Sequence, residues 1–280
     1  MRLAQRLVIR YIRAKFRFLS SISKRKAAEK AFRLFCTPQS RNRKKLPPVF
    51  EKAERLKFPL EGSIVRGYRW NHPSPKKLLI LHGFESSVIN FDRYVHPLVK
   101  KGYEVLAFDA PAHGRSSGHT INVITYKNMV KHIMQEFGPV QAFIAHSFGG
   151  LSLSLALEET EHNDTDKIVM IAPAAETTRA IDNFFRFLRL DNSLRVEFDD
   201  IIEKMGGHSP SWYSVSRAAS SIKAQVLFLQ DKEDDLTPLK DVTPLIEKKL
   251  PNFRFVISEG LGHSRIYRDN QTVKTVMEFL

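Results

Sequence analysis

The stretch VQAFIAHSFGGLSLSLALEE, residues 140–159, joins an apolar run to a helical pattern through one serine, Ser147, and two glycines. The run before the serine favours a buried strand, and the residues after it favour a buried helix. A serine at such a bend exposes its hydroxyl beside the helix N-terminus. A tight turn without chemistry needs the same small residues, so this stretch alone leaves both interpretations open.

Apolar runs of the same kind recur along the chain, separated by helical patterns. They lie at 62–70, 76–83, 103–111, 140–147, 166–173, 224–231 and 253–260. Strands that are apolar on both faces and alternate with helices indicate a mainly parallel sheet covered on both sides. We therefore expect an α/β fold of about eight strands, with catalytic groups at the carboxyl ends of the strands.

A mostly helical segment at about 174–222 interrupts this alternation between two strands, and we expect it to form a helical cap. It is rich in large apolar side chains: Phe184, Phe185, Phe187, Leu188, Leu190, Trp212 and Tyr213. Two interpretations stay open. These side chains either form the core of the cap or line an apolar pocket for the acyl or alcohol group of a substrate.

The net charge of +14 belongs to the first 50 residues and not to the rest of the chain. Residues 1–50 hold 15 Lys and Arg but one acid, Glu29, so the other 230 residues sum to zero charge. This distribution argues against nucleic acid as a partner of the main domain. The single cysteine, Cys36, excludes an intramolecular disulfide and fits a reducing compartment.

The N-terminal segment predicts an amphipathic helix over residues 2–19. At about 100° per residue, its five arginines fall within an arc of roughly 80°, and apolar residues fill most of the rest. Three roles stay open: packing on the main domain or a second subunit, docking of residues 2–45 on an anionic membrane surface, and a cleaved targeting peptide. We expect a cytoplasmic protein, either free or peripheral on the inner membrane face.

A serine nucleophile needs a base and an acid, and the last two strands supply candidates. Asp231, Asp234 and Asp235 follow the strand at 224–231, and His263 follows the strand at 253–260. His146 is adjacent to Ser147, but alternation along a strand predicts that it points to the other side.

Five stretches, in this order along the chain, resemble the motifs of the α/β-hydrolase superfamily, over roughly residues 60–280. They are LHGF (81–84), FDAPAHGRSSG (108–118), AHSFGG (145–150), DKEDDLTP (231–238) and GLGHS (260–264). The chain is similar to the esterase and serine aminopeptidase-like branch. FDAPAHG and the N-terminal arm are also similar to a bacterial subgroup that implies no particular substrate.

The resemblance implies a role for each matching residue. Ser147 would be the nucleophile, His263 the base, and Asp234 the acid, because it precedes Pro238 by four residues as in the family. The backbone N–H groups of Phe84 and Phe148 would form the oxyanion hole. Ala145 departs from the family pattern, which has glycine at that position.

The sequence thus predicts a basic N-terminal arm over residues 1–50. Over residues 51–280 it predicts an α/β-hydrolase domain with a helical cap at about 174–222. The expected activity is hydrolysis of a small carboxylic ester with an apolar acyl or alcohol group, through an acyl-enzyme. A serine aminopeptidase, a thioesterase, an acyltransferase and a non-catalytic binding protein are the alternatives. No metal or organic cofactor is implied, because metal-ligand pairs and phosphate-binding glycine loops do not occur in the sequence. The sequence does not indicate the oligomeric state.

Overall fold

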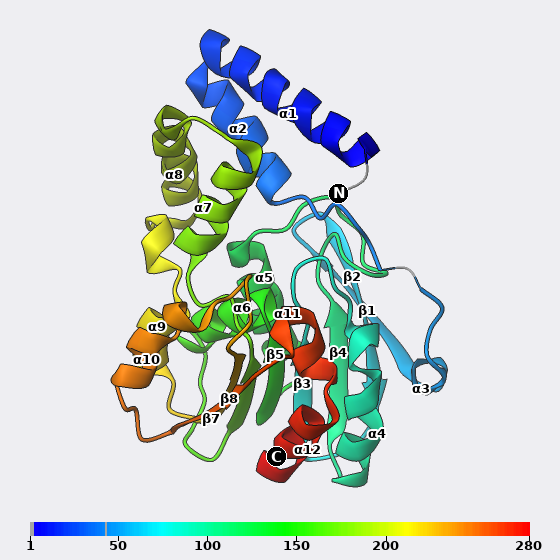
Figure 1. Ribbon diagram of the computed structural model, residues 1–280. Coiled ribbons are helices and arrows are strands. Elements are labelled where there is room, and N and C mark those ends of the chain that lie inside the picture. The colour runs from blue at the N-terminus through cyan, green and yellow to red at the C-terminus, as the bar shows by residue number, and fades with distance from the viewer. Residues whose placement is uncertain (1–2, 43) are drawn as a thin grey trace. The chain divides into compact units, whose positions relative to one another are not determined.

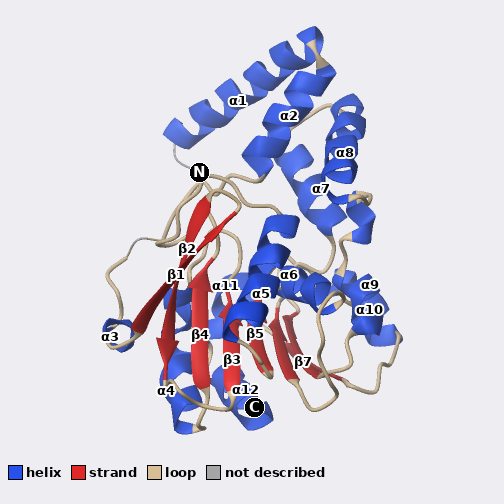
Figure 2. Cartoon of the chain, turned by 180° about the vertical axis from the view of Figure 1, so that it is seen from behind, coloured by secondary structure: helices blue, strands red, loops and turns tan. Residues whose placement is uncertain are grey.

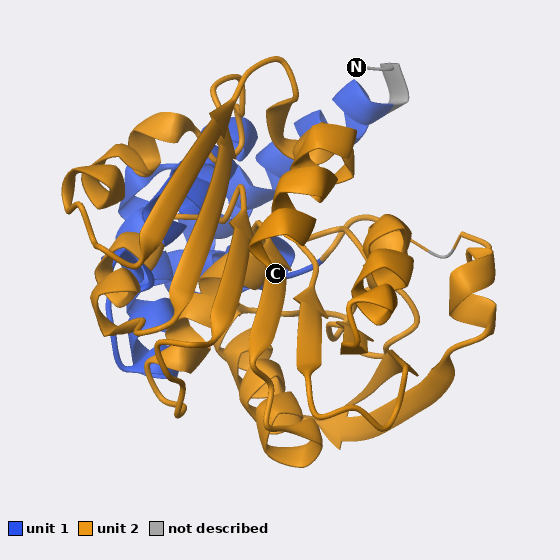
Figure 3. Ribbon diagram, turned by 90° about the horizontal axis from the view of Figure 1, so that it is seen from below, with its two compact units in different colours: residues 1–37, 176–214 blue, residues 38–175, 215–280 orange. Residues whose placement is uncertain are grey.

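The computed structural model describes residues 3–42 and 44–280, and the chain divides into two compact units (Figure 3). The helical unit combines Met1–Thr37 with Glu176–Ser214, and the sheet unit combines Pro38–Ala175 with Val215–Leu280. This division differs from the one expected from the sequence. The helices of the N-terminal arm group with the inserted segment, which is shorter than the predicted 174–222.

The sheet unit is built on eight strands, which are the red arrows of Figure 2. They are β1 (Glu54–Leu60), β2 (Ser63–Trp70), β3 (Lys77–Leu81), β4 (Glu104–Asp109), β5 (Ala142–His146), β6 (Lys167–Ile171), β7 (Gln225–Asp231) and β8 (Phe253–Ser258). Their order is β1-β2-β4-β3-β5-β6-β7-β8. β2 is antiparallel to β1 and β4, and all other pairs are parallel. The predicted fold class is confirmed.

The apolar runs of the sequence correspond to β2 through β8, but β1 was not predicted. Its sequence, ERLKFPL, carries three charges and a proline, and only Phe58 is buried. A strand at the edge of a sheet tolerates proline and charged residues because one side of it has no neighbouring strand.

Helices cover both faces of the sheet (Figure 1). α4 (Asp92–Lys100) packs against α12 (Asn270–Phe279) on one face, and α5 (Val123–Phe137) packs against α6 (Phe148–Leu157) on the other. The remaining α-helices of this unit are α3 (Pro48–Glu51), α9 (Val215–Ala218), α10 (Thr243–Glu247) and α11 (Gly262–Arg265). β3, β4 and β5 are almost wholly buried between these layers, which explains their uninterrupted apolar sequences.

The helical unit is held together by aromatic side chains. Its α-helices are α1 (Leu3–Ile22), α2 (Lys24–Phe35), α7 (Thr177–Leu188) and α8 (Asn192–Gly206), followed by the 3₁₀ helix η2 (Pro210–Trp212). The Phe32 and Phe198 ring centroids lie 5.5 Å apart, and those of Phe35 and Phe184 lie 5.3 Å apart. Edge-to-face contacts at these distances stabilise a core. Phe184 therefore belongs to a core shared with α2.

Short 3₁₀ helices complete the structure of the sheet unit. They are η1 (Val88–Phe91), η3 (Ala219–Ser221), η4 (Leu239–Asp241) and η5 (Ile266–Arg268). Among the helices of residues 3–42 and 44–280, none combines the length and the apolar character needed to cross a bilayer.

Candidate active site

Ser147 occupies a strained bend between β5 and α6. Its φ of 53° and ψ of −120° lie in a region that side-chain-bearing residues rarely adopt. The surrounding backbone holds this conformation, because the Ser147 N–H donates to Ile171 O at 3.1 Å and the Ser147 carbonyl accepts from the Ala174 N–H at 3.0 Å. The bend follows the strand directly, so the serine hydroxyl projects from the carboxyl edge of the sheet.

Small residues around Ser147 let the backbone segments approach each other. A Cβ on Gly149 would lie 2.7 Å from His82 O, and a Cβ on Gly150 would lie 2.7 Å from the Pro173 Cβ. Real Cβ atoms do not come so close, so both positions need glycine. Ala145 is fully buried on β5, and the structure accommodates its methyl group there.

The structure brings the three predicted catalytic side chains together in one hydrogen-bonded chain. His263 Nε2 lies 3.0 Å from Ser147 Oγ, and His263 Nδ1 lies 2.8 Å from Asp234 Oδ2. A carboxylate beside Nδ1 keeps the proton on that nitrogen, so Nε2 is free to accept from the serine hydroxyl. Ser147 comes after β5, Asp234 after β7 and His263 after β8, all at the carboxyl edge of the parallel sheet.

Asp234 accepts several hydrogen bonds in the loop that follows β7. Its Oδ1 accepts the Leu236 and Thr237 N–H groups at 2.9 and 2.8 Å, and its Oδ2 accepts the Thr237 hydroxyl at 2.8 Å. Burial alone would raise the pKa of Asp234, but hydrogen bonds from His263 and Thr237 hold that pKa below its usual value. Asp234 is therefore ionised when His263 donates to it.

The two rival aspartates have other environments. Asp235 is exposed. Asp231 stabilises the segment that leads from β8 to His263. It accepts the Ser258 hydroxyl at 2.7 Å and the Leu261 and Gly262 N–H groups at 3.2 and 2.9 Å. Of the three aspartates, Asp234 is the one bonded to His263.

His146 lies against His263, contrary to the prediction that it points away. The ring centroids of the two histidines are 4.8 Å apart, and His146 Nε2 donates to the His263 carbonyl at 3.2 Å. His146 is still part of β5, but the backbone turns sharply at Ser147, so the side chains of these two neighbours do not alternate as they would within a strand. His146 thus holds the backbone of His263, and no sequence signal beyond its adjacency to Ser147 indicates this role.

The turn after β3 approaches Ser147 closely through Gly83. A Cβ on Gly83 would lie 2.9 Å from the Ser147 Cβ and 3.0 Å from His146 Nδ1. His82 orients this turn: its Nε2 accepts the Ala110 N–H at 3.0 Å, so its proton is on Nδ1, which donates to Gly83 O at 2.7 Å. Because the peptide is trans, the N–H of Phe84 points opposite to that carbonyl.

The candidate oxyanion residues, Phe84 and Phe148, lie side by side. Their rings meet edge to face with centroids 6.0 Å apart, and Phe148 is the first residue of α6. The first N–H groups of a helix have no partner within the helix and favour negative charge. The Phe148 N–H thus has no partner within α6 and lies next to Ser147 in the chain.

Comparison with known proteins agrees with this fold. The family model described as serine aminopeptidase, S33, matches residues 72–205. The uncharacterized protein YqkD of Bacillus subtilis is 27% identical over 246 residues, covering 82% of this chain and 81% of its own. The uncharacterized hydrolase YugF of the same organism is 27% identical over 207 residues, covering 65% and 73%. The solved structure of the Pyrococcus furiosus esterase Pf2001 matches with a TM-score of 0.64 at 22% identity, covering 88% of this chain and 97% of the esterase.

The fold and these matches support the α/β-hydrolase superfamily that the five ordered motifs predict, and the matches indicate a hydrolase. Among residues 3–42 and 44–280, no group of three or more His, Cys, Asp or Glu side chains is arranged to hold a metal ion.

In the part of the chain that the structure describes, three histidines are buried: His82, His113 and His146. His113 Nε2 accepts the Glu85 N–H at 2.9 Å while its Nδ1 donates to Pro111 O at 3.0 Å, so it braces the turn after Phe84. Burial lowers the pKa of His82 to about 4 and those of His113 and His146 to about 3. These three imidazoles, which hydrogen-bond to the backbone of Gly83, Glu85 and His263, are therefore neutral.

These histidines predict a loss of stability in mild acid. In the unfolded chain they titrate near pH 6.5, so unfolding below that pH takes up about three protons. The free energy of unfolding is therefore highest above pH 6.5 and declines as the pH falls toward 4. We expect each buried histidine to lower the free energy of unfolding by about 2 kcal/mol at pH 5. Urea unfolding followed by tryptophan fluorescence at pH 7, 6 and 5 measures this loss.

Two single substitutions sharpen the measurement. His113→Gln keeps an acceptor for the Glu85 N–H and should reduce the proton uptake by about one third. The exposed His119, replaced by glutamine, is the matched control and should leave the uptake unchanged. A wild-type stability that is flat between pH 7 and 5 would contradict the assignment of these three side chains as buried and neutral.

Proposed function

We propose that this α/β-hydrolase is a serine hydrolase that cleaves carboxylic esters through an acyl-enzyme. The observation that carries the proposal is the hydrogen-bonded chain from Ser147 Oγ to His263 Nε2, 3.0 Å, and from His263 Nδ1 to Asp234 Oδ2, 2.8 Å. A serine hydroxyl is a weak nucleophile until a base takes its proton, and an oriented histidine is the base that such a site needs.

In the first half of the reaction, His263 Nε2 takes the Ser147 proton as Oγ bonds to the ester carbonyl carbon. The carbonyl electron pair moves onto oxygen, and the N–H groups of Phe84 and Phe148 stabilise the oxyanion. Asp234 stabilises the imidazolium. When the oxyanion collapses, the C–O bond to the alcohol breaks, and His263 gives its proton to the departing alcohol oxygen.

Water then releases the acyl group. His263 Nε2 takes a proton from water as the water oxygen bonds to the acyl carbon. This step forms a second oxyanion, which the same N–H groups stabilise. Collapse breaks the bond from the acyl carbon to Ser147 Oγ, and His263 returns the proton to that oxygen. The carboxylic acid leaves, and the enzyme regains its starting state.

The buried carboxylates near the site are not free to bind a substrate amine, as an aminopeptidase requires. Asp109, Asp231 and Asp234 are all engaged in internal hydrogen bonds. An ester requires no such group. The esterase fold of Pf2001, which this chain covers over 97% of its length, also supports an ester substrate.

The proposal is tested by labelling followed by a substrate series. A fluorophosphonate probe should label Ser147, identified by mass spectrometry of the modified peptide, and labelling should fail in Ser147→Ala. Hydrolysis of p-nitrophenyl esters of rising chain length then defines the acyl pocket, with alanine p-nitroanilide as the aminopeptidase substrate. A folded wild-type chain that the probe does not label would favour a non-catalytic binding protein, and turnover of the anilide alone would favour a peptidase.

Gly83→Ala should impair catalysis more than stability. The new Cβ would press on the Ser147 Cβ at 2.9 Å and displace either the nucleophile or the turn that presents the Phe84 N–H. We expect kcat/KM for the best p-nitrophenyl ester to fall by about 10²-fold. Steady-state kinetics and thermal melting measure the two effects.

Gly67→Ala is the matched control because its Cβ would also clash, at 2.1 Å, but with the ring of Phe108. It should lower Tm and leave kcat per folded enzyme unchanged. If Gly83→Ala retains activity within about three-fold of wild type, the close approach of Gly83 does not support the oxyanion hole.

A further inference from the structure

Helix α1 has two apolar faces, and only one of them is covered within the helical unit. The covered face holds the buried Phe16 and the half-buried Ile9, Ile12 and Leu19, and α1 packs on α2 and α7. At about 100° per residue, the opposite face holds four side chains that are 56–67% exposed: Leu7, Tyr11, Phe18 and Ile22. We call these four residues the outer face of α1. A contiguous exposed apolar stripe of this kind marks an interaction surface.

A row of arginines borders the outer face. Arg6, Arg10 and Arg17 are exposed and follow one another at helical spacing along one edge of it. Arg2 and Arg43, which belong to the same basic pattern in the sequence, lie outside the described residues.

Acidic side chains of the helical unit pair with other arginines. Arg195 binds Asp182 at 2.6 Å and Asp199 at 2.7 Å, and Arg25 pairs with Glu197 at 3.5 Å. In contrast, Arg17 and Arg13 form no ion pair with the part of the chain that the structure describes. The charges on α1 are therefore left available.

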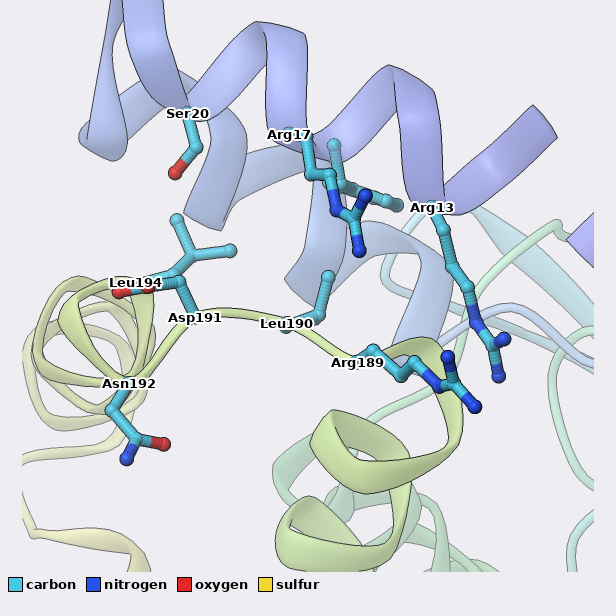
Figure 4. A pocket seen from close by; sticks show the side chains of 9 residues that line it. Arg13, Arg17, Ser20, Arg189, Leu190, Asp191, Asn192 and Leu194 are labelled. Atoms are coloured by element: carbon cyan, nitrogen blue, oxygen red, sulfur yellow. The ribbon is translucent and has the colours of Figure 1, made fainter. Parts of the chain in front are cut away.

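These unpaired arginines line a cavity of about 440 Å³ beside α1. In Figure 4, Arg13 and Arg17 extend from α1 toward the connection between α7 and α8, where Arg189 lies. Arg13 donates to Phe187 O at 2.6 Å, while its Nε is buried without a partner among the described residues. The one carboxylate of the lining, Asp191, caps α8 by accepting the Ser193 N–H at 2.7 Å. Three guanidinium groups against one carboxylate make this cavity suited to an anionic oxygen group.

We propose that the outer face of α1 and its arginine row dock the protein on an anionic phospholipid bilayer. In the interface, Tyr11 and Phe18 would enter the boundary between headgroups and acyl chains, and the arginines would bind lipid phosphates. Charge complementarity selects this partner. Antiparallel docking of a second copy through the same face would bring two arginine rows to the same side, and the like charges would repel.

Binding to vesicles tests the proposal on the full-length chain. Pure phosphatidylcholine vesicles are compared with vesicles that also contain phosphatidylglycerol, by co-sedimentation at low salt. Wild type should bind the anionic vesicles and release them as salt rises. The variant Arg10→Gln/Arg17→Gln should bind about 25-fold more weakly, at about five-fold per charge. The variant Tyr11→Ser/Phe18→Ser should lose at least about ten-fold.

Matched controls remove the same chemistry elsewhere in the helical unit. Lys30→Gln/Arg33→Gln removes two exposed charges from α2, and Val196→Ser/Met205→Ser removes two exposed apolar side chains from α8. Both should bind like wild type, and all variants should melt within a few degrees of it. Equal binding to both vesicle types, no binding to anionic vesicles, or equal losses in the controls would overturn the proposal. A wild-type dimer that Tyr11→Ser/Phe18→Ser dissociates would assign the outer face to a second copy instead.

Discussion

Replacing Ser147 with alanine is expected to lower kcat for a carboxylic ester by about 10⁴- to 10⁶-fold. The variant removes the oxygen that forms the acyl-enzyme and leaves the N–H groups of Phe84 and Phe148 in place. His263→Ala should cost a similar factor, because it removes the base that accepts the Ser147 proton at 3.0 Å. Single-turnover kinetics with a p-nitrophenyl ester separate this chemical step from substrate binding.

The two losses should not multiply. Ser147 and His263 act as one unit, so the double variant should be about as slow as either single one. Full additivity, or fluorophosphonate labelling at a residue other than Ser147, would show that the nucleophile is elsewhere.

Asp234→Asn is expected to lower kcat by about 10³- to 10⁴-fold. The amide cannot stabilise the imidazolium, and it can donate to His263 Nδ1, which would put the imidazole proton on Nε2 and block acceptance from Ser147. The buried position of Asp234 and its 2.8 Å contact with His263 carry this expectation. Steady-state kinetics with the same ester measure it, and circular dichroism verifies that the variant is folded.

Two neighbouring aspartates provide the controls. Asp235→Asn changes an exposed side chain and should leave kcat within about two-fold of wild type. Asp231→Asn weakens the bonds to the Leu261 and Gly262 N–H groups, so it should lower Tm and change kcat by less than about ten-fold. If Asp235→Asn proves the crippling change, the acid of the triad has been misassigned.

The central strands were predictable because both of their faces are buried, so nearly every residue in them is apolar. β4, EVLAFD, is buried at all six positions, so its sequence is a continuous apolar run apart from the end residues. β1 was not predicted because its charges and Pro59 interrupt the apolar run. β8 is also an edge strand with one buried residue, Phe253, but its sequence FRFVIS is mostly apolar and it was predicted. An apolar run thus detects a strand, and a strand without such a run is missed.

The three proposed triad residues could be identified from the sequence because each follows a predicted strand within a recognisable motif. The contact between His146 and His263 could not, since it depends on the sharp bend at Ser147 that reverses the expected side-chain direction. The role of Gly83 depends on its distance to Ser147, a tertiary property that no local pattern encodes. The same limit applies to α2, whose amphipathic pattern predicts a buried face but not the partner that buries it.

The helical unit is assembled from two segments that leave the ribosome at different times. Roughly 140 residues separate Thr37 from Glu176, and α2 packs on α8 from the second segment. At about 5–20 residues per second, α1 and α2 emerge on the order of ten seconds before their partner helices are synthesised. The phenylalanines of α2 are without Phe184 and Phe198 for that interval. The nascent N-terminal helices are therefore expected to be clients of ribosome-associated chaperones, whereas the sheet unit can begin to condense as each successive strand is synthesised.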